Sequence, residues 1–128
     1  MPVKLTLTLL PAPMAVAKLA ASDPIPDWAQ RGAFFSIMRT PQELSVVDED
    51  SSVPASAQCE RGWRMFKLEG PFAFSATGVL DSVLHPLAEA KISIFAISTF
   101  DTDYVMVKEV DLDAAIVVLR KAGHEVRV

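Results

Sequence analysis

Polar and apolar residues alternate strictly at the start of the chain, in KLTLTLL (4–10). An alternation with a period of two places Leu5, Leu7 and Leu9 on one face, which predicts a half-buried strand over residues 3–9. Later apolar runs that are bounded by turn residues predict further strands. These strands are expected over residues 33–39, 43–48, 63–69, 92–98, 104–109 and 124–128.

Two later segments carry apolar residues spaced three or four apart, which is the period of an amphipathic helix. One spans residues 78–90, and Ser75 or Thr77 can cap its start. The other follows Asp111, which is expected to be its N-cap, and stops at Gly123. A shorter helix is predicted near residues 14–21.

The predicted elements of the second half follow the order βαββαβ, which is the ferredoxin-like arrangement. The first half repeats part of this order, and FFSIMRTPQELSVVDE (34–49) aligns with IFAISTFDTDYVMVKE (94–109) at an offset of 60 residues. We therefore predict an α+β fold of two such units packed together, with antiparallel sheets and helices on one face. The Ser- and Pro-containing stretch 50–61 is the expected linker. The predicted units are a degraded N-terminal one, 1–60, and a complete C-terminal one, 61–128.

Composition narrows the range of functions. Sixteen acidic against 12 basic residues give a net charge of −4, and no Lys or Arg cluster stands out, which argues against nucleic acid and membranes as partners. Cys59 is the one cysteine, and His85 and His124 lack the spacing of zinc ligands, so neither a metal nor a cofactor is predicted. The alternation after Lys4 argues against a secretory leader, and we expect a cytoplasmic protein.

Two loops of the second half are expected at the same end of the sheet, because successive elements of a βαββαβ unit reverse direction. One is FSATG (74–78), where free N–H groups at a helix start attract a carboxylate and Gly78 allows close approach to the backbone. The other is the hairpin STFDTD (98–103), where Asp101 and Asp103 attract an ammonium or guanidinium group and Phe100 can close over a ligand. Together they predict a site for an amino-acid zwitterion. The alternative is a solvated turn whose carboxylates cap their own backbone.

The segments ATGVLDSVLHPLA (76–88) and ISTFDTDYVMV (97–107) resemble the ACT domain of the arginine-sensor (CASTOR-like) and aspartokinase type, and the first half resembles a companion ACT repeat. The resemblance implies small-molecule regulatory modules that pair side by side and bind an amino acid at the interface. It therefore implies a homodimer and a partner enzyme or regulator. By position, it assigns the ligand's main-chain end to Thr77, Gly78 and Val79. It assigns the opposite wall of the site to Thr99, Phe100, Asp101 and Asp103.

Two functions remain open at this point. The first is a regulatory protein that binds an amino acid between residues 74–79 and 98–103. The alternative is a structural or interaction module that oligomerises or docks on a partner without a ligand. No catalytic residue is predicted and an enzyme is not expected, because the sequence shows no nucleophile–base pair and no phosphate-binding Gly loop.

Overall fold

The computed structural model describes residues 3–73 and 76–128. Residue contacts divide the chain into two units. The C-terminal unit combines Met1–Pro11 with Arg64–Val128, and the N-terminal unit is Ala12–Trp63.

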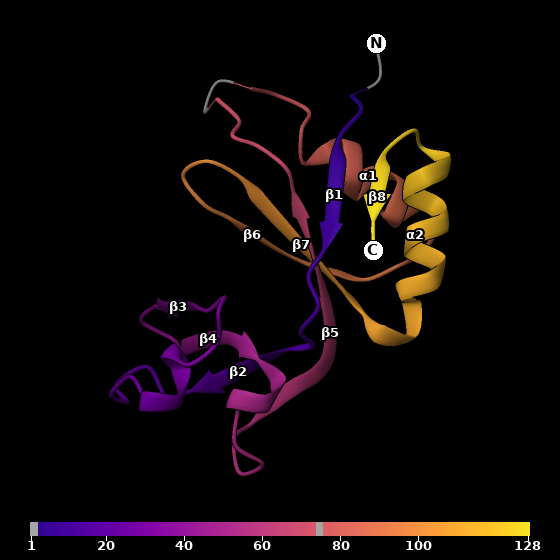
Figure 1. The fold of residues 1–128 in the computed structure, drawn as a ribbon. Helices are drawn as coiled ribbons and strands as arrows, with labels where there is room; N and C mark the ends of the chain where they lie inside the picture. The colour runs from indigo at the N-terminus through magenta and orange to yellow at the C-terminus, as the bar shows by residue number, and fades with distance from the viewer. Residues whose placement is uncertain (1–2, 74–75) are drawn as a thin grey trace. The chain divides into compact units, whose positions relative to one another are not determined.

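The C-terminal unit is a sheet with two α-helices on one face (Figure 1). Its strands are β1 (Thr6–Leu9), the second half of β5 (Cys59–Leu68), β6 (Ile94–Ser98), β7 (Asp103–Lys108) and β8 (Glu125–Arg127). Its helices are α1 (Asp81–Glu89), α2 (Leu112–Lys121) and a short 3₁₀ turn, η3 (Glu109–Asp111). The strands lie in the order β6–β7–β5–β1–β8.

From β5 onward the C-terminal unit follows the order βαββαβ, which confirms the predicted ferredoxin-like α+β fold. The position of β1 differs from the prediction. This strand lies between β5 and β8, antiparallel to β5 but parallel to β8, so the sheet is not purely antiparallel. Leu7 of β1 is fully buried and pairs with Leu68 and Val126, so the alternating leucines of the N-terminus supply part of this unit's core.

The two helices cover the sheet with their apolar stripes. Val83 and Leu87 of α1 and Ala115 and Leu119 of α2 are fully buried in one cluster with the inward residues of the strands. Burying a side chain such as Leu119 contributes about 1.5–3 kcal/mol. Both helices lack a side-chain hydrogen bond at the N-cap, which corrects the predicted cap at Asp111, and α1 begins later than predicted, at Asp81.

The N-terminal unit is an antiparallel sheet with the strand order β3–β4–β2–β5. Its own strands are β2 (Met14–Leu19), β3 (Ser36–Arg39) and β4 (Leu44–Glu49), and the start of β5 completes it. Every residue of this unit is described, and its helical elements are two 3₁₀ turns, η1 (Asp27–Gln30) and η2 (Asp50–Ser52). The prediction of α-helices on one face therefore holds for the C-terminal unit alone.

The helix predicted near residues 14–21 is wrong, because this segment is strand β2. Its Ala-rich sequence favours a helix locally, and it shows no polar–apolar alternation. However, β2 is a central strand that pairs with β4 on one edge and β5 on the other. Ala15 and Ala17 are almost completely buried, so pairing and packing override the local propensity.

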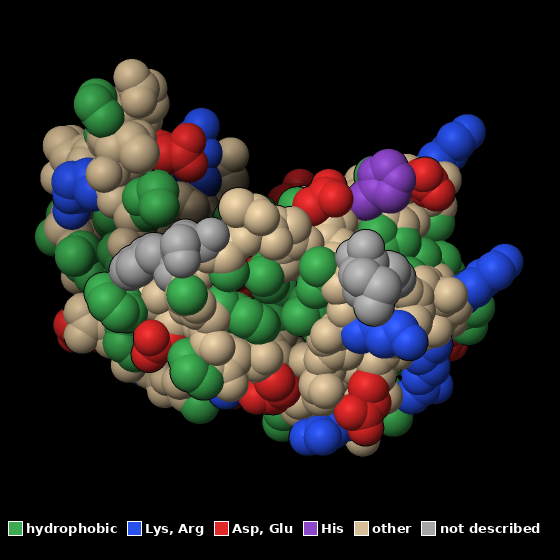
Figure 2. Space-filling model, turned by 90° about the horizontal axis from the view of Figure 1, so that it is seen from above, with side chains coloured by type: hydrophobic (Ala, Val, Ile, Leu, Met, Phe, Trp, Pro, Cys, Tyr) green, Lys and Arg blue, Asp and Glu red, His purple; other side chains and the backbone are tan. Residues whose placement is uncertain are grey.

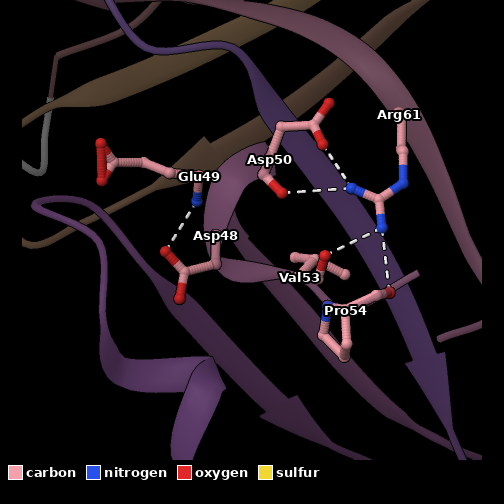
Figure 3. A network of polar contacts seen from close by, with 6 residues as sticks. All are labelled: Asp48, Glu49, Asp50, Val53, Pro54 and Arg61. Carbon is pink, nitrogen blue, oxygen red and sulfur yellow. Dashed lines mark hydrogen bonds and ion pairs between the residues drawn. The ribbon is translucent and has the colours of Figure 1, made fainter. Parts of the chain in front are cut away.

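Residues 50–61 do not form the predicted linker. β5 already begins at Cys59, and the division between the units falls within this strand, after Trp63. Arg61 holds the preceding loop in place, with hydrogen bonds to the carbonyl oxygens of Asp50 at 3.1 Å and of Val53 and Pro54 at 2.9 Å (Figure 3). Its ion pair with the Asp50 carboxylate raises the pKa of Arg61.

Candidate functional site

Asp103 and Ser98 are the last pair of the β6–β7 ladder in the C-terminal unit. The pleat of β7 places Asp103 on the same face as Val105 and Val107, which are fully buried beneath the helices. Asp103 therefore faces the helix side of the sheet, beyond the edge of the core, and is half-buried. Its Oδ1 accepts a hydrogen bond from the Ser98 hydroxyl, which fixes the carboxylate.

The hairpin turn between β6 and β7 is closed by threonines. The Thr99 N–H donates to the Thr102 carbonyl at 2.8 Å, and the Thr102 N–H donates to Thr99 Oγ1 at 3.2 Å. The Thr102 hydroxyl in turn donates to the Leu68 carbonyl, which ties the turn to the end of β5. The alternative of a turn capped by its own aspartates therefore finds no support among the described residues, since threonine hydroxyls make these bonds.

The segment after β5 presses closely on this turn. The Phe72 N–H donates to the Asp101 carbonyl at 2.7 Å. A Cβ built on Gly70 would lie 2.9 Å from that same oxygen, so this position has no room for a larger residue. Backbone contacts, not only side chains, thus bring the segment that leads to α1 against the hairpin turn.

A cavity of about 230 Å³ lies between the segment before α1 and the hairpin turn. Four of the seven predicted site residues that matter most for charge and closure line it: Val79 on one side, and Phe100, Asp101 and Asp103 on the other. Thr99 lines it as well. The remaining lining residues, which the sequence reasoning missed, are Phe72, Ala73, Ala76, Ser98 and Thr102. Ser98 could have been found, because hairpin pairing places it opposite Asp103.

Thr77 and Gly78 are not among the residues that line this cavity. Thr77 is exposed, and Gly78 has φ 77° and borders a separate cavity of about 380 Å³ next to α1. Because α1 begins at Asp81, the amides at its start lie further along the chain than predicted. No acceptor among the described residues bonds the N–H groups of Gly78, Val79 and Leu80. Phe74 and Ser75 of the predicted loop lie outside the described residues.

The N-terminal unit contains the same turn. The Thr40 N–H donates to the Glu43 carbonyl at 2.8 Å, and the Glu43 N–H donates to Thr40 Oγ1 at 3.1 Å. The innermost pair of this hairpin is Arg39 and Leu44. Thr40 thus corresponds to Thr99, which makes the structural offset between the hairpins 59 residues and corrects the offset of 60 predicted from the sequence.

The two hairpins differ at the first residue of their second strand. In the N-terminal unit this residue is Leu44, which is fully buried in the core. In the C-terminal unit it is Asp103, which faces the cavity beside Ser98. A position that the fold fills with an apolar side chain in one unit therefore carries a carboxylate in the other.

His124 and His85 lie outside this cavity. His124 is 5% exposed, and its Nδ1 accepts from the Leu5 N–H at 3.0 Å while its Nε2 lies 2.8 Å from the Ser82 carbonyl oxygen. This pattern fits a neutral ring that links β1, α1 and β8. His85 pairs with Glu89 at 2.8 Å on the exposed side of α1. Both histidines therefore have structural partners.

Charge and composition of the described residues exclude two further kinds of site. Acidic and basic side chains are interspersed on the face shown in Figure 2, without a continuous basic surface for a polyanion. No cluster of His, Cys, Asp or Glu within residues 3–73 and 76–128 could hold a metal ion. None of the described helices is long and apolar enough to span a membrane.

Comparison with protein-family models gives two matches along the chain. The model of the ACT domain matches residues 58–121, which is half of the chain. A second model, of an N-terminal domain, matches residues 13–56. The boundary between the two matches lies near the division between the two units, at Trp63.

Curated relatives include the protein named "Cytosolic arginine sensor for mTORC1 subunit 1" from Bos taurus and from Homo sapiens. The Bos taurus protein is 33% identical over 97 residues and the human one 32% over 97 residues, each covering 67% of this chain. The chain spans 30% of the length of these relatives.

Solved structures show the same fold. A protein from Agrobacterium tumefaciens is 41% identical, with a TM-score of 0.92 over 97% of this chain and 92% of that one. The regulatory subunit of aspartate kinase from Thermus thermophilus has a TM-score of 0.61 at 12% identity, over 91% of this chain and 97% of that one. The aspartokinase alpha and beta subunits give 0.65 at 16% identity, over 94% and 98%. The aspartokinase matches carry the fold alone.

Proposed function

Because this chain belongs to the ACT domain family, we propose that it is a regulatory protein that binds a small amino acid in the cavity between residues 72–79 and 98–103. The observation that carries this proposal is the carboxylate of Asp103 at the edge of that cavity. Its counterpart in the N-terminal unit is the buried Leu44. The ligand, rather than the fold, explains a charge at this position.

The cavity suits a ligand of this size. Clefts that take drug-sized molecules hold roughly 300–1,000 Å³. The cavity here is about 230 Å³, which favours a small metabolite. Ligand-efficiency bounds for about ten heavy atoms give an affinity in the micromolar to millimolar range.

The charges around the cavity suit a zwitterion. Asp101 and Asp103 provide two carboxylates on the hairpin side, which attract an ammonium or guanidinium group. The N–H groups of Gly78 to Leu80, which no described residue accepts, lie on the segment that leads into α1 and suit a carboxylate. In this arrangement Asp103 binds the cationic group, Ser98 orients Asp103, and Phe100 covers the ligand. Thr77, Gly78 and Val79 hold its main-chain end.

Arginine is the first ligand to test. The curated relatives are named arginine sensors, and a guanidinium group can bond both oxygens of a carboxylate. The same names support a cytosolic location for this chain, together with a partner enzyme or regulator. The relatives are regulatory proteins by name, which supports a role without catalysis.

A thermal-shift screen of the twenty amino acids at millimolar concentration tests this proposal. A ligand that binds only the folded state must raise the melting temperature, by about 2.7 kcal/mol of added stability at a concentration of 100 Kd. We expect one or a few amino acids, arginine first, to give a shift. Asp103→Asn should remove the shift and leave the fold intact.

The matched control is Glu43→Gln, which changes an acid to its amide in the corresponding turn of the N-terminal unit. It should leave the ligand-induced shift as in the wild type. If no amino acid shifts the wild-type protein, the alternative of an interaction module takes over. An equal effect of both substitutions would show that Asp103 does not act through a site.

A further inference from the structure

Helix α2 carries an apolar stripe on its solvent-exposed side. Val117 is 65% exposed, Val110 in the preceding turn is 87% exposed, and Ala114 between them is exposed as well. Val110 and Val117 are separated by seven residues, which is about two helical turns, so they lie on the same side. The buried side of α2, with Ala115 and Leu119, faces the sheet.

The neighbouring helix α1 has a different exposed side. Its exposed residues include Asp81, His85 and Glu89, and the last two form an ion pair at 2.8 Å. Both helices lie on the same face of the same sheet (Figure 1), so the difference comes from their sequences, not from their position on it. A charged exposed side needs no partner, whereas two aligned valines leave apolar area in water.

Charges flank this stripe symmetrically. Asp113 lies four residues before Val117 in the first turn of α2, and Lys121 lies four residues after it in the last turn. The structure gives neither side chain an ion pair among the described residues. Arg120, by contrast, is engaged within its own chain, since it donates to the Val126 carbonyl at 2.8 Å.

We propose that the exposed side of α2 docks on the α2 helix of a second copy of this chain, in an antiparallel pair centred on Val117. A twofold axis at Val117 brings Asp113 of each copy opposite Lys121 of the other, because both lie at the same distance along the axis. The valines pack together at the centre, and two equivalent ion pairs flank them. The antiparallel helix dipoles favour this arrangement as well. The interaction goes beyond ligand binding and does not involve the cavity at residues 98–103.

The expected association is weak. One helix from each copy buries less than the roughly 1,200 Å² of a standard interface, which corresponds to dissociation constants from about 10 µM to 1 mM. Sedimentation velocity across this concentration range should show a monomer–dimer equilibrium. A protein that stays monomeric up to about 1 mM would overturn the proposal.

The first variant is Val117→Glu, which places two carboxylates at the twofold axis. It should raise the dissociation constant at least about tenfold, which corresponds to 1.4 kcal/mol. Its melting temperature should stay as in the wild type, because Val117 is exposed. Ala88→Glu adds the same charge to an exposed position of α1 and should leave the dimer intact.

A charge exchange tests the antiparallel orientation. Asp113→Lys and Lys121→Asp should each weaken the dimer about threefold to tenfold, and the double exchange should restore it, because the ion pair is rebuilt with reversed polarity. A dimer that ignores Val117→Glu, or single exchanges that the double exchange does not rescue, would show that another surface forms the contact.

Discussion

The β3–β4 hairpin of the N-terminal unit and the β6–β7 hairpin of the C-terminal unit share one turn but differ in what they present. In each, a threonine N–H and hydroxyl bond the residue three positions later, in Thr40–Glu43 and Thr99–Thr102. The residue that follows the turn is buried Leu44 in the first hairpin and cavity-lining Asp103 in the second. The turn thus belongs to the fold, whereas Asp103 is explained by a ligand.

The same comparison separates stability from binding. Leu44 fills a core position, so its removal should affect folding. Asp103 is half-buried at the edge of the core and holds only Ser98, so its removal should affect binding. Reciprocal substitutions at corresponding positions therefore have opposite expected outcomes.

The largest effect is expected from exchanging these two residues. Leu44→Asp places a carboxylate in the core of the N-terminal unit and should lower the free energy of unfolding by about 3–5 kcal/mol. Asp103→Leu should change it by less than about 1 kcal/mol while raising the ligand's dissociation constant at least tenfold. Urea denaturation and calorimetric titration measure the two quantities. A large loss of stability in Asp103→Leu would show that the carboxylate supports the fold instead.

Gly70→Ala tests the close contact that shapes the cavity. The new methyl would lie 2.9 Å from the Asp101 carbonyl oxygen, so the turn must move, at a cost of about 1–3 kcal/mol and with weaker ligand binding. Gly62→Ala in the N-terminal unit is the control. There the backbone has φ 76° but no atom lies within 4 Å of the new methyl, so only backbone strain is added. Equal ligand binding in both variants would show that the contact at Gly70 does not shape the site.

Thr40→Ala and Thr99→Ala compare the two turns directly. Each removes a hydroxyl that accepts the N–H at the far side of its turn, so each should cost about 0.5–1.5 kcal/mol. The two losses should be similar because the bonds are the same. Only Thr99→Ala should weaken ligand binding, and an effect of Thr40→Ala on binding would contradict the assignment of the site to the C-terminal unit.

The smallest effect concerns Glu69, at the end of β5. The Thr8 hydroxyl at 2.6 Å lowers the pKa of this carboxyl, and Lys67 adds to the shift. A lowered pKa in the folded state stabilises the protein above the unfolded-state value of about 4.3, and this contribution is lost as the pH falls through the folded-state value. Thr8→Val should therefore lower stability by at most about 1 kcal/mol at pH 7 and by progressively less toward pH 3. A difference that does not depend on pH would assign the effect to packing.

The sequence predicted the C-terminal unit well because its segments carry clear periods. The stripes of α1 and α2 and the runs of β6 and β7 each identify one element, and the order of elements then places the segment before α1 beside the hairpin turn. The Asp103 position follows from that order. The presence of a bound amino acid stays a prediction.

Features that depend on distant pairing could not be predicted. The strand β2 looks helical by composition, and its two neighbours along the sheet decide its structure. The insertion of β1 between β5 and β8 depends on the burial of Leu7 in a core formed mostly by residues that come much later in the chain. The offset of 59 residues became visible only in the hydrogen bonds of Thr40 and Thr99. The prediction that the first unit is a degraded copy of the second is supported by these shared turns.

Amide chemical shifts recorded during titration with arginine and the other amino acids test the central claim most directly. The account predicts that signals of residues 76–79 and 98–103 move with a common dissociation constant. Signals of the corresponding turn, residues 40–43, should stay in place. Equal shifts in both turns, or shifts confined to the turn of the N-terminal unit, would contradict the assignment of the binding site to Asp103.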